Sequence, residues 1–144
     1  MTPAQSRFQN ASNSAVIATG LWLYWSKNFA EKTDPYSNVG GPGEVLAHNT
    51  HILAAPFLVF AAGLLWKIHI WPRFQQLSLS KMGILKGMSG LFMLLTLVPM
   101  ILSGALIQVT TGEAARKIWI GIHVFSSLIW VAASLFHLIK GKAR

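Results

Sequence analysis

The sequence predicts an all-α integral membrane protein, a four-helix bundle formed by a single domain of residues 1–144. Two observations carry this prediction. The chain is 53% hydrophobic and only 11% charged, whereas soluble domains contain about 25% charged residues. Apolar runs of roughly 20 residues, the length that a helix needs to cross a bilayer, also recur along the chain. A water-exposed surface cannot be built from so few charged side chains, so we expect the helices to face lipid.

Three of the expected helices are strongly apolar. The clearest covers about 115–139, another about 46–70, and the third about 84–109. Pro99 lies inside the third and should kink it, which a membrane bundle tolerates because neighbouring groups satisfy the freed backbone atoms.

The first helix, about 8–30, is weaker because its apolar part is short. If it spans, Asn10, Ser12 and Asn13 must face the interior of the bundle. A cleaved signal peptide is the alternative, but the segment has just Arg7 ahead of the apolar stretch and lacks an A-x-A site. We therefore expect this helix to be retained. Polar loops are expected at 31–45, 71–82 and 110–114.

Basic residues lie at the ends of the apolar runs, which indicates membrane topology rather than nucleic-acid binding despite the net charge of +8. With the N-terminus in the cytoplasm, eight of the twelve fall on that side: Arg7, Lys67, Arg73, Lys81, Lys86, Lys140, Lys142 and Arg144. All four acidic residues fall on the other side with the remaining four basic ones. Both termini are therefore expected in the cytoplasm, with membrane lipid and no nucleic acid as a partner.

All five histidines lie within or beside two apolar helices: His48, His51, His69, His123 and His137. Ionisable groups inside a membrane are costly and mark functional sites, although one isolated histidine is often a hydrogen-bonded packing residue. His123 and His137 are 14 residues apart, and His51 and His69 are 18 apart. In a helix these separations correspond to a rise of about 21 Å and about 27 Å, respectively. Both also bring the two histidines of a helix to nearly the same face of that helix.

One crossing separates these two helices, so they run parallel and their histidines meet at matching depths. His51 is expected opposite His123, and His69 opposite His137, giving two sites stacked across the bilayer. Paired imidazoles without a carboxylate or thiolate suit the axial positions of a haem iron. The absence of cysteine excludes iron–sulfur clusters and covalently attached c-type haem.

Gly90 and Gly104 are also 14 residues apart. They would let a flat macrocycle lie against the helix backbone, or they would serve close helix packing, and both interpretations stay open. Arg116 and Lys117 on one side could pair with haem propionates, as could Lys67, Arg73 or Lys140 on the other. Membrane topology is the alternative explanation for each.

The runs His51–Gly63, Trp66–Pro72, Val98–Gly104 and Trp119–Ser127 resemble small membrane cytochromes b. This group is similar in plan to the four-helix di-haem cytochrome b subunits of formate dehydrogenase and thiosulfate reductase. The resemblance implies two non-covalent haem b groups, bis-histidine ligation by His51, His69, His123 and His137, and residence in the bacterial inner membrane. His48 has no counterpart; it could replace His51 as a ligand or lie near a propionate or quinone.

The expected function is electron transfer across the bilayer between a redox partner, such as a cytochrome c or an iron–sulfur protein, and the quinone pool or a cytochrome c. Without a sizeable soluble domain, the chain would act as a subunit of a larger oxidoreductase complex rather than as an enzyme by itself. A quinone site at the non-cytoplasmic end is left open. The rivals are a histidine-based transition-metal transporter, which would usually employ transmembrane Asp or Glu, and a non-redox scaffold subunit.

Overall fold

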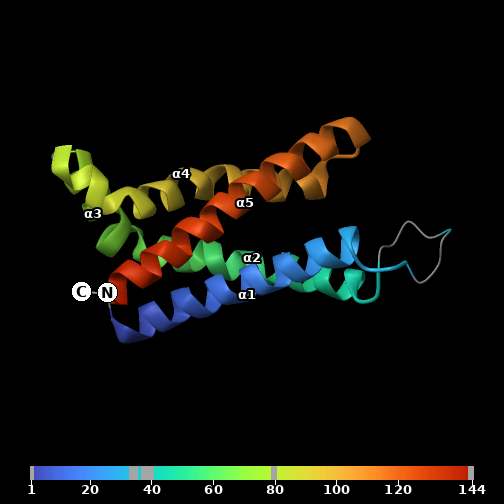
Figure 1. The fold of residues 1–144 in the computed structure, drawn as a ribbon, viewed down its shortest axis with the longest axis horizontal. Coiled ribbons are helices and arrows are strands. Elements are labelled where there is room, and N and C mark those ends of the chain that lie inside the picture. Colours follow the sequence, from blue (N-terminus) through green and yellow to red (C-terminus); the bar gives the residue numbers. More distant parts are fainter. Residues whose placement is uncertain (1, 33–35, 37–40, 79–80, 143–144) are drawn as a thin grey trace. The chain divides into compact units, whose positions relative to one another are not determined.

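Four long helices make up most of the protein (Figure 1). The computed structural model describes the backbone of residues 2–32, 36, 41–78 and 81–142. It describes the side chains of the same residues except 77–78, 81–88 and 140–142. The chain divides into two compact units, Met1–His69 and Ile70–Arg144. The described residues are helical apart from short connections, which confirms the predicted all-α class.

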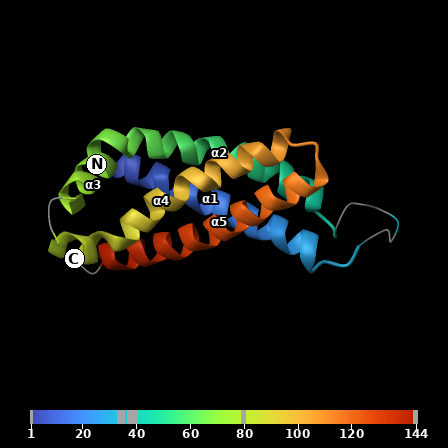
Figure 2. The ribbon, with the colours of Figure 1, turned by 90° about the horizontal axis from the view of Figure 1, so that it is seen from above.

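The first unit is an antiparallel hairpin of α1 (Pro3–Asn28) and α2 (Glu44–Leu65) (Figure 2). A capping box starts α1: the Thr2 hydroxyl accepts from the Gln5 amide at 3.2 Å, and the Gln5 side chain accepts from the Thr2 amide at 2.8 Å. Two backbone donors that the helix start would leave unpaired are thereby satisfied.

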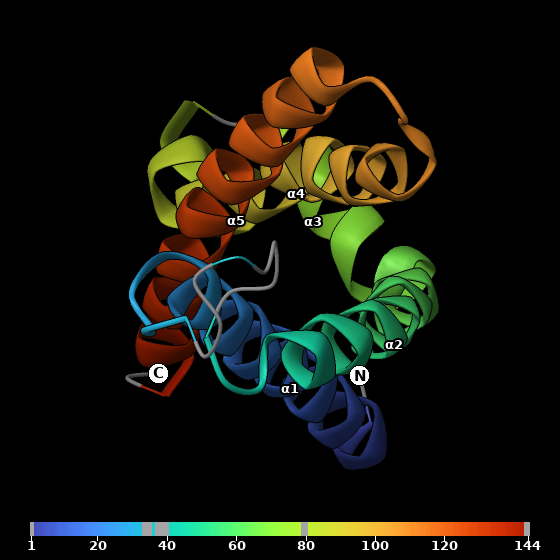
Figure 3. The same cartoon turned by 90° about the vertical axis from the view of Figure 1, so that its right-hand side faces the viewer.

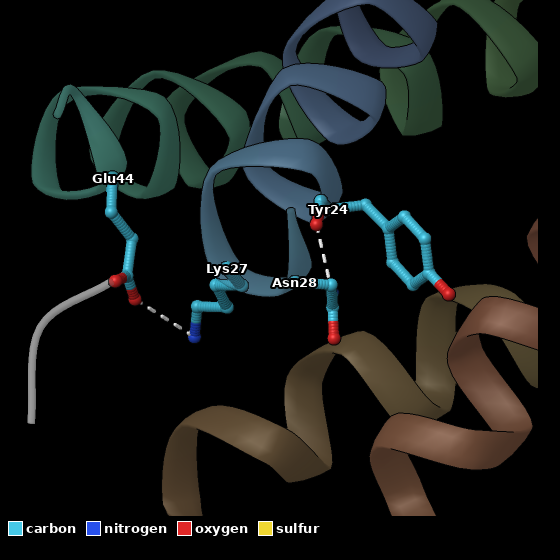
Figure 4. Close-up of polar contacts among 4 residues, drawn as sticks. All are labelled: Tyr24, Lys27, Asn28 and Glu44. Carbon is cyan, nitrogen blue, oxygen red and sulfur yellow. Dashed lines mark hydrogen bonds and ion pairs between the residues drawn. The ribbon is translucent and has the colours of Figure 1, made fainter. Parts of the chain in front are cut away.

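Contacts at both ends align the two helices of this hairpin. Near the start of α1, the rings of Phe8 and Phe60 meet edge to face with centroids 6.1 Å apart. Near its end, Lys27 forms an ion pair with Glu44 at 3.3 Å (Figure 4). In the same view, the Asn28 side chain donates to the Tyr24 carbonyl at 2.7 Å. Gly43, the N-cap residue immediately before α2, has φ of 82°, a backbone conformation that favours glycine.

Polar side chains on the first half of α1 are buried as expected, with one exception. Ser12 and Asn13 are buried, whereas Asn10 is exposed. The Gln9 amide donates to the Asn13 side-chain oxygen at 2.7 Å. The polar face of α1 is therefore narrower than the sequence suggested, and it includes Gln9.

A π-helical turn, η1 (Trp66–Ile70), follows α2 and contains His69. The next helix, α3 (Trp71–Ser78), has Pro72 in its first turn. Proline lacks the amide hydrogen that the Ile68 carbonyl would receive in a regular α-helix, which disfavours α-helical bonding one turn before it. The loop expected at 71–82 is thus wrong over residues 71–78, because a proline is tolerated in the first turn of a helix. It is also wrong at 81–82, where the next long helix has already begun.

The second unit contains an antiparallel hairpin of α4 (Lys81–Val109) and α5 (Glu113–Lys142), with α3 packed against α4. Figure 3 shows the two helices of this hairpin from the side of the turn that joins them. The turn covers residues 110–112, two residues shorter than the predicted 110–114 loop, because α5 begins at Glu113. The Gly112 carbonyl accepts from the Arg116 amide at 2.9 Å. α4 continues through Pro99.

Within the described residues, three helical stretches are long and apolar enough to cross a membrane: Glu44–Gln76, Ser89–Val109 and Glu113–Ile139. They coincide with the three strongest predicted spans. A membrane crossing by α1 stays a prediction. Of the predicted 31–45 loop, residues 33–35 and 37–40 lie outside the described residues, and 44–45 belong to α2 instead.

Candidate functional site

His123 on α5 lies in a polar niche formed by α4. Its Nδ1 is 2.9 Å from the Met100 carbonyl oxygen and 3.3 Å from the Ser103 hydroxyl. A Cβ built on Gly104 would lie 3.2 Å from Cε1 of this imidazole, so the missing side chain provides the room for the ring.

The hydrogen bonds around His123 define which nitrogen of its ring carries the proton. The Ser103 hydroxyl donates to the Pro99 carbonyl at 2.5 Å and also approaches the Met100 carbonyl at 3.2 Å. A carbonyl accepts and cannot donate, so the contact with Met100 requires a proton on Nδ1 of His123. In a neutral imidazole of this tautomer, Nε2 carries the lone pair that a metal binds.

His137 repeats this arrangement further along α5. Its Nδ1 is 3.2 Å from the Ser89 hydroxyl, and Cε1 of the ring lies 3.9 Å from a Cβ built on Gly90. The two serine–glycine pairs on α4 are 14 residues apart, as are the two histidines on α5. Because the helices are antiparallel, the repeat brings one pair to each histidine.

His51 has the same environment in the first unit. Its Nδ1 is 3.1 Å from the Thr19 hydroxyl, and a Cβ built on Gly20 would lie 3.0 Å from Cε1 of the ring. The Thr19 hydroxyl donates to the Ala15 carbonyl at 2.7 Å, so its oxygen accepts a hydrogen bond from Nδ1–H of His51. Each of these three histidines thus contacts a hydroxyl of its own and lies against a glycine, both on the neighbouring helix of its hairpin.

The remaining two histidines differ from these three. His69 lies in the π-helical turn, where each residue advances less around the axis than in an α-helix, so it lags behind the predicted face by roughly 70°. His48 makes no hydrogen bond within the described part of the chain. The lag turns His69 away from His48 as well, so that His69 lies roughly 70° from His51 and roughly 130° from His48 around the axis. His51 is still the nearer of the two to the face of His69.

The predicted basic residues lie in different surroundings. The Arg73 guanidinium is close enough to His137 for its charge to act on the imidazole, and it donates to the Gln76 side chain at 3.2 Å. Lys117 forms an ion pair with Glu113 at 2.7 Å, and Arg116 is exposed in the first turn of α5. Of the three, Arg73 is the one whose charge acts on a predicted ligand.

Sequence reasoning missed the hydroxyl partners Thr19, Ser89 and Ser103. A signal was present, since Ser89 and Ser103 immediately precede the two glycines that were singled out for their 14-residue spacing. The glycines themselves accommodate the imidazoles of the adjacent helix, an arrangement that neither earlier interpretation described.

The predicted pairings of His51 with His123 and of His69 with His137 join the two units and stay predictions. Among the described residues, no three or more His, Cys, Asp or Glu side chains gather where they could hold a metal ion. Comparison with protein-family models, curated proteins and solved structures found no match.

Proposed function

We propose that the chain is an integral membrane cytochrome b subunit that carries two haem b groups and passes electrons across the bilayer. One observation carries the proposal: three of the four predicted ligand histidines have Nδ1 at a hydroxyl and the ring against a glycine of the neighbouring helix. Histidines that bind metals typically donate the other ring N–H in this way, which fixes the ring and its tautomer.

The donor chemistry of these residues fits a haem iron. Thr19 and Ser103 accept from Nδ1 and leave Nε2 as the nitrogen with a lone pair, which is the atom that an axial ligand offers. The histidines lie in helices long and apolar enough to span a membrane, and burial of that kind stabilises a non-covalent macrocycle. His51, His69, His123 and His137 would hold the two irons.

The haem groups would supply reversible one-electron chemistry, and the chain would supply position, burial and adjustment of the potential. Arg73, close to His137, has the charge to pair with a propionate carboxylate. Electron exchange with a partner subunit of a larger complex, and with a quinone or cytochrome c, remains part of this proposal through the resemblance to small membrane cytochromes b.

The test is the haem content of the purified full chain. A pyridine haemochrome assay should give two haem b per chain. Acidic acetone should extract all of this haem from the protein, because it is not covalently attached. His123→Ala and His137→Ala should each reduce that content toward one. Loss follows because an iron without one axial imidazole has lost half of its protein ligation.

Ser126→Ala provides the matched control on the same helix. Ser126 is buried, and its hydroxyl donates to the Ile122 carbonyl of its own helix at 2.7 Å. This variant should keep two haems. A colourless wild-type preparation from haem-sufficient cells, or equal haem loss in Ser126→Ala and His123→Ala, would contradict the proposal and favour a scaffold or transporter role.

A further inference from the structure

The short helix α3 has two faces of different chemistry. Trp71 and Phe74 lie one turn apart with their rings stacked, and the ring centroids are 5.8 Å apart. Arg73 and Gln76 are also one turn apart, joined by the 3.2 Å hydrogen bond from the guanidinium. At 100° per residue this polar pair lies on the side of the helix roughly opposite to the aromatic pair. All four side chains are exposed, so α3 is an amphipathic helix with both faces accessible.

The connection of α3 to α4 indicates its level relative to a membrane. The apolar span of α4 begins at Ser89, so the first two turns of this helix, residues 81–88, precede it. The 21 residues of that span correspond to about 31 Å, which is the thickness of the hydrocarbon core. Residues 79–80 join α3 to the two turns that precede the span. With the span in a bilayer, this junction falls in the headgroup region.

Basic residues gather at this end of the second unit. Arg73 lies in α3, and the antiparallel helices of the hairpin bring further basic positions to the same end, in the first two turns of α4 and the last turn of α5: Lys81, Lys86, Lys140 and Lys142. The acidic residue of this unit, Glu113, follows the other end of α4, a helix of 29 residues or about 44 Å. Salt screens exposed charges beyond about 10 Å, so Glu113 does not neutralise this end.

We propose that α3 lies in the headgroup region of the bilayer and binds an anionic phospholipid. A short amphipathic helix with Trp and Phe on one face and a basic residue on the other suits this boundary. Trp71 and Phe74 would contact the upper part of the acyl chains, as tryptophan does at membrane surfaces. The Arg73 guanidinium would donate to the phosphate with the two-pronged geometry that favours arginine at such groups. The neighbouring lysine positions add attraction for a headgroup with net negative charge.

A lipid accounts for both faces of α3, whereas an acidic protein partner would account for the basic face alone. The stacked aromatic pair needs an apolar contact, and the acyl chains provide one beside the phosphate. A guanidinium has five N–H donors, so a phosphate at Arg73 leaves donors for the propionate proposed above. The inference does not depend on the haem.

The first test measures lipid retention by the full chain in detergent, with native mass spectrometry. Phosphatidylglycerol and phosphatidylcholine with identical acyl chains are added in equal amounts, and wild type should retain the anionic lipid preferentially. Arg73→Gln should weaken this retention about fivefold, the effect expected of one cation at an anionic surface, and Arg73→Lys should keep most of it. Arg116→Gln is the matched control, an exposed arginine at the other end of the same unit, and should leave retention unchanged.

The second test measures the depth of Trp71 in bilayers. Tryptophan fluorescence is quenched by lipids that carry bromine either near the headgroup or deep in the acyl chain, and the signal of Trp71 is the difference between wild type and Trp71→Phe. Bromine near the headgroup should quench Trp71 more. Trp130 lies well inside the apolar span of α5, so the corresponding difference for Trp130→Phe should favour deep bromine.

The possible results separate this proposal from its rivals. Equal retention of the two lipids would overturn it and leave this end of the unit to an acidic protein partner. Equal losses in Arg73→Gln and Arg116→Gln would also overturn it, because they would indicate attraction to the net charge alone. Quenching of Trp71 with the depth profile of Trp130 would place α3 in the hydrocarbon core and contradict the proposal. Absence of haem from the same samples would overturn the proposed function and leave this inference standing.

Discussion

Gly104 and Gly121 offer a direct measurement of how closely the imidazole packs. Alanine in place of either glycine gains about 1 kcal/mol of intrinsic helix stability. At Gly121 a Cβ meets nothing within 4 Å, so Gly121→Ala should keep that gain. At Gly104 the Cβ would lie 3.2 Å from Cε1 and 3.3 Å from Nδ1 of His123, so the ring must shift by a few tenths of an ångström.

That shift has two costs. Overpacking of a well-filled site costs about 1–3 kcal/mol, and weakening of the 2.9 Å hydrogen bond from His123 to the Met100 carbonyl costs about 0.5–1.5 kcal/mol. Gly104→Ala should therefore be less stable than Gly121→Ala by about 2–4 kcal/mol. In the first unit, Gly20→Ala should compare in the same way with Gly63→Ala, where a Cβ also meets nothing within 4 Å.

The assay is unfolding of the detergent-solubilised protein by dodecyl sulfate, followed by far-ultraviolet circular dichroism, with haem content measured on the same samples. Gly104→Ala and Gly20→Ala should also bind less haem than their matched variants. Equal stability and equal haem content within each pair would refute the argument that glycine is needed to seat the imidazole.

Two further predictions concern topology and the second helix. Reporter fusions at residues 1 and 144 should both be cytoplasmic, since eight of the twelve basic residues fall on that side if α1 spans; termini on opposite sides would show that it does not. His51→Ala should lose one haem, because His51 has the threonine–glycine environment, whereas His48→Ala should retain both. The reverse result would show that the ligand on α2 has been assigned one helical turn away from its true position.

The helices were predictable from composition and length, and their irregularities were not. Apolar runs long enough to cross a bilayer indicated the three strongest helices, whose positions agree with the structure. The π-turn at Trp66–Ile70 escaped detection because hydrophobicity does not distinguish i+4 from i+5 bonding; Pro72 was the available clue. For the same reason, the predicted alignment of His51 with His69 assumed a regular helix that the chain does not form.

The candidate site was predictable at its titratable residues and not at their partners. Histidine is conspicuous in an apolar helix, but serine and threonine there usually bond the carbonyl three or four residues earlier, as Ser126 does. Ser103 and Thr19 do this and also reach a histidine. That second contact depends on the pairing of α4 with α5 and of α1 with α2, which spacing within one helix does not specify.

The hydroxyls of Thr19 and Ser103 have a consequence for cofactor capture. Each donates its hydrogen bond to a carbonyl of its own helix, so its oxygen accepts a hydrogen bond from an imidazole N–H before any cofactor is bound. The rotational freedom of His51 and His123 is consequently lost during folding rather than during binding. Immobilising a side chain at the moment of binding typically costs about 0.5–1.5 kcal/mol. In the proposed cytochrome, the hairpins would present preorganised ligands, and haem association would carry a smaller entropic penalty than with freely rotating histidines.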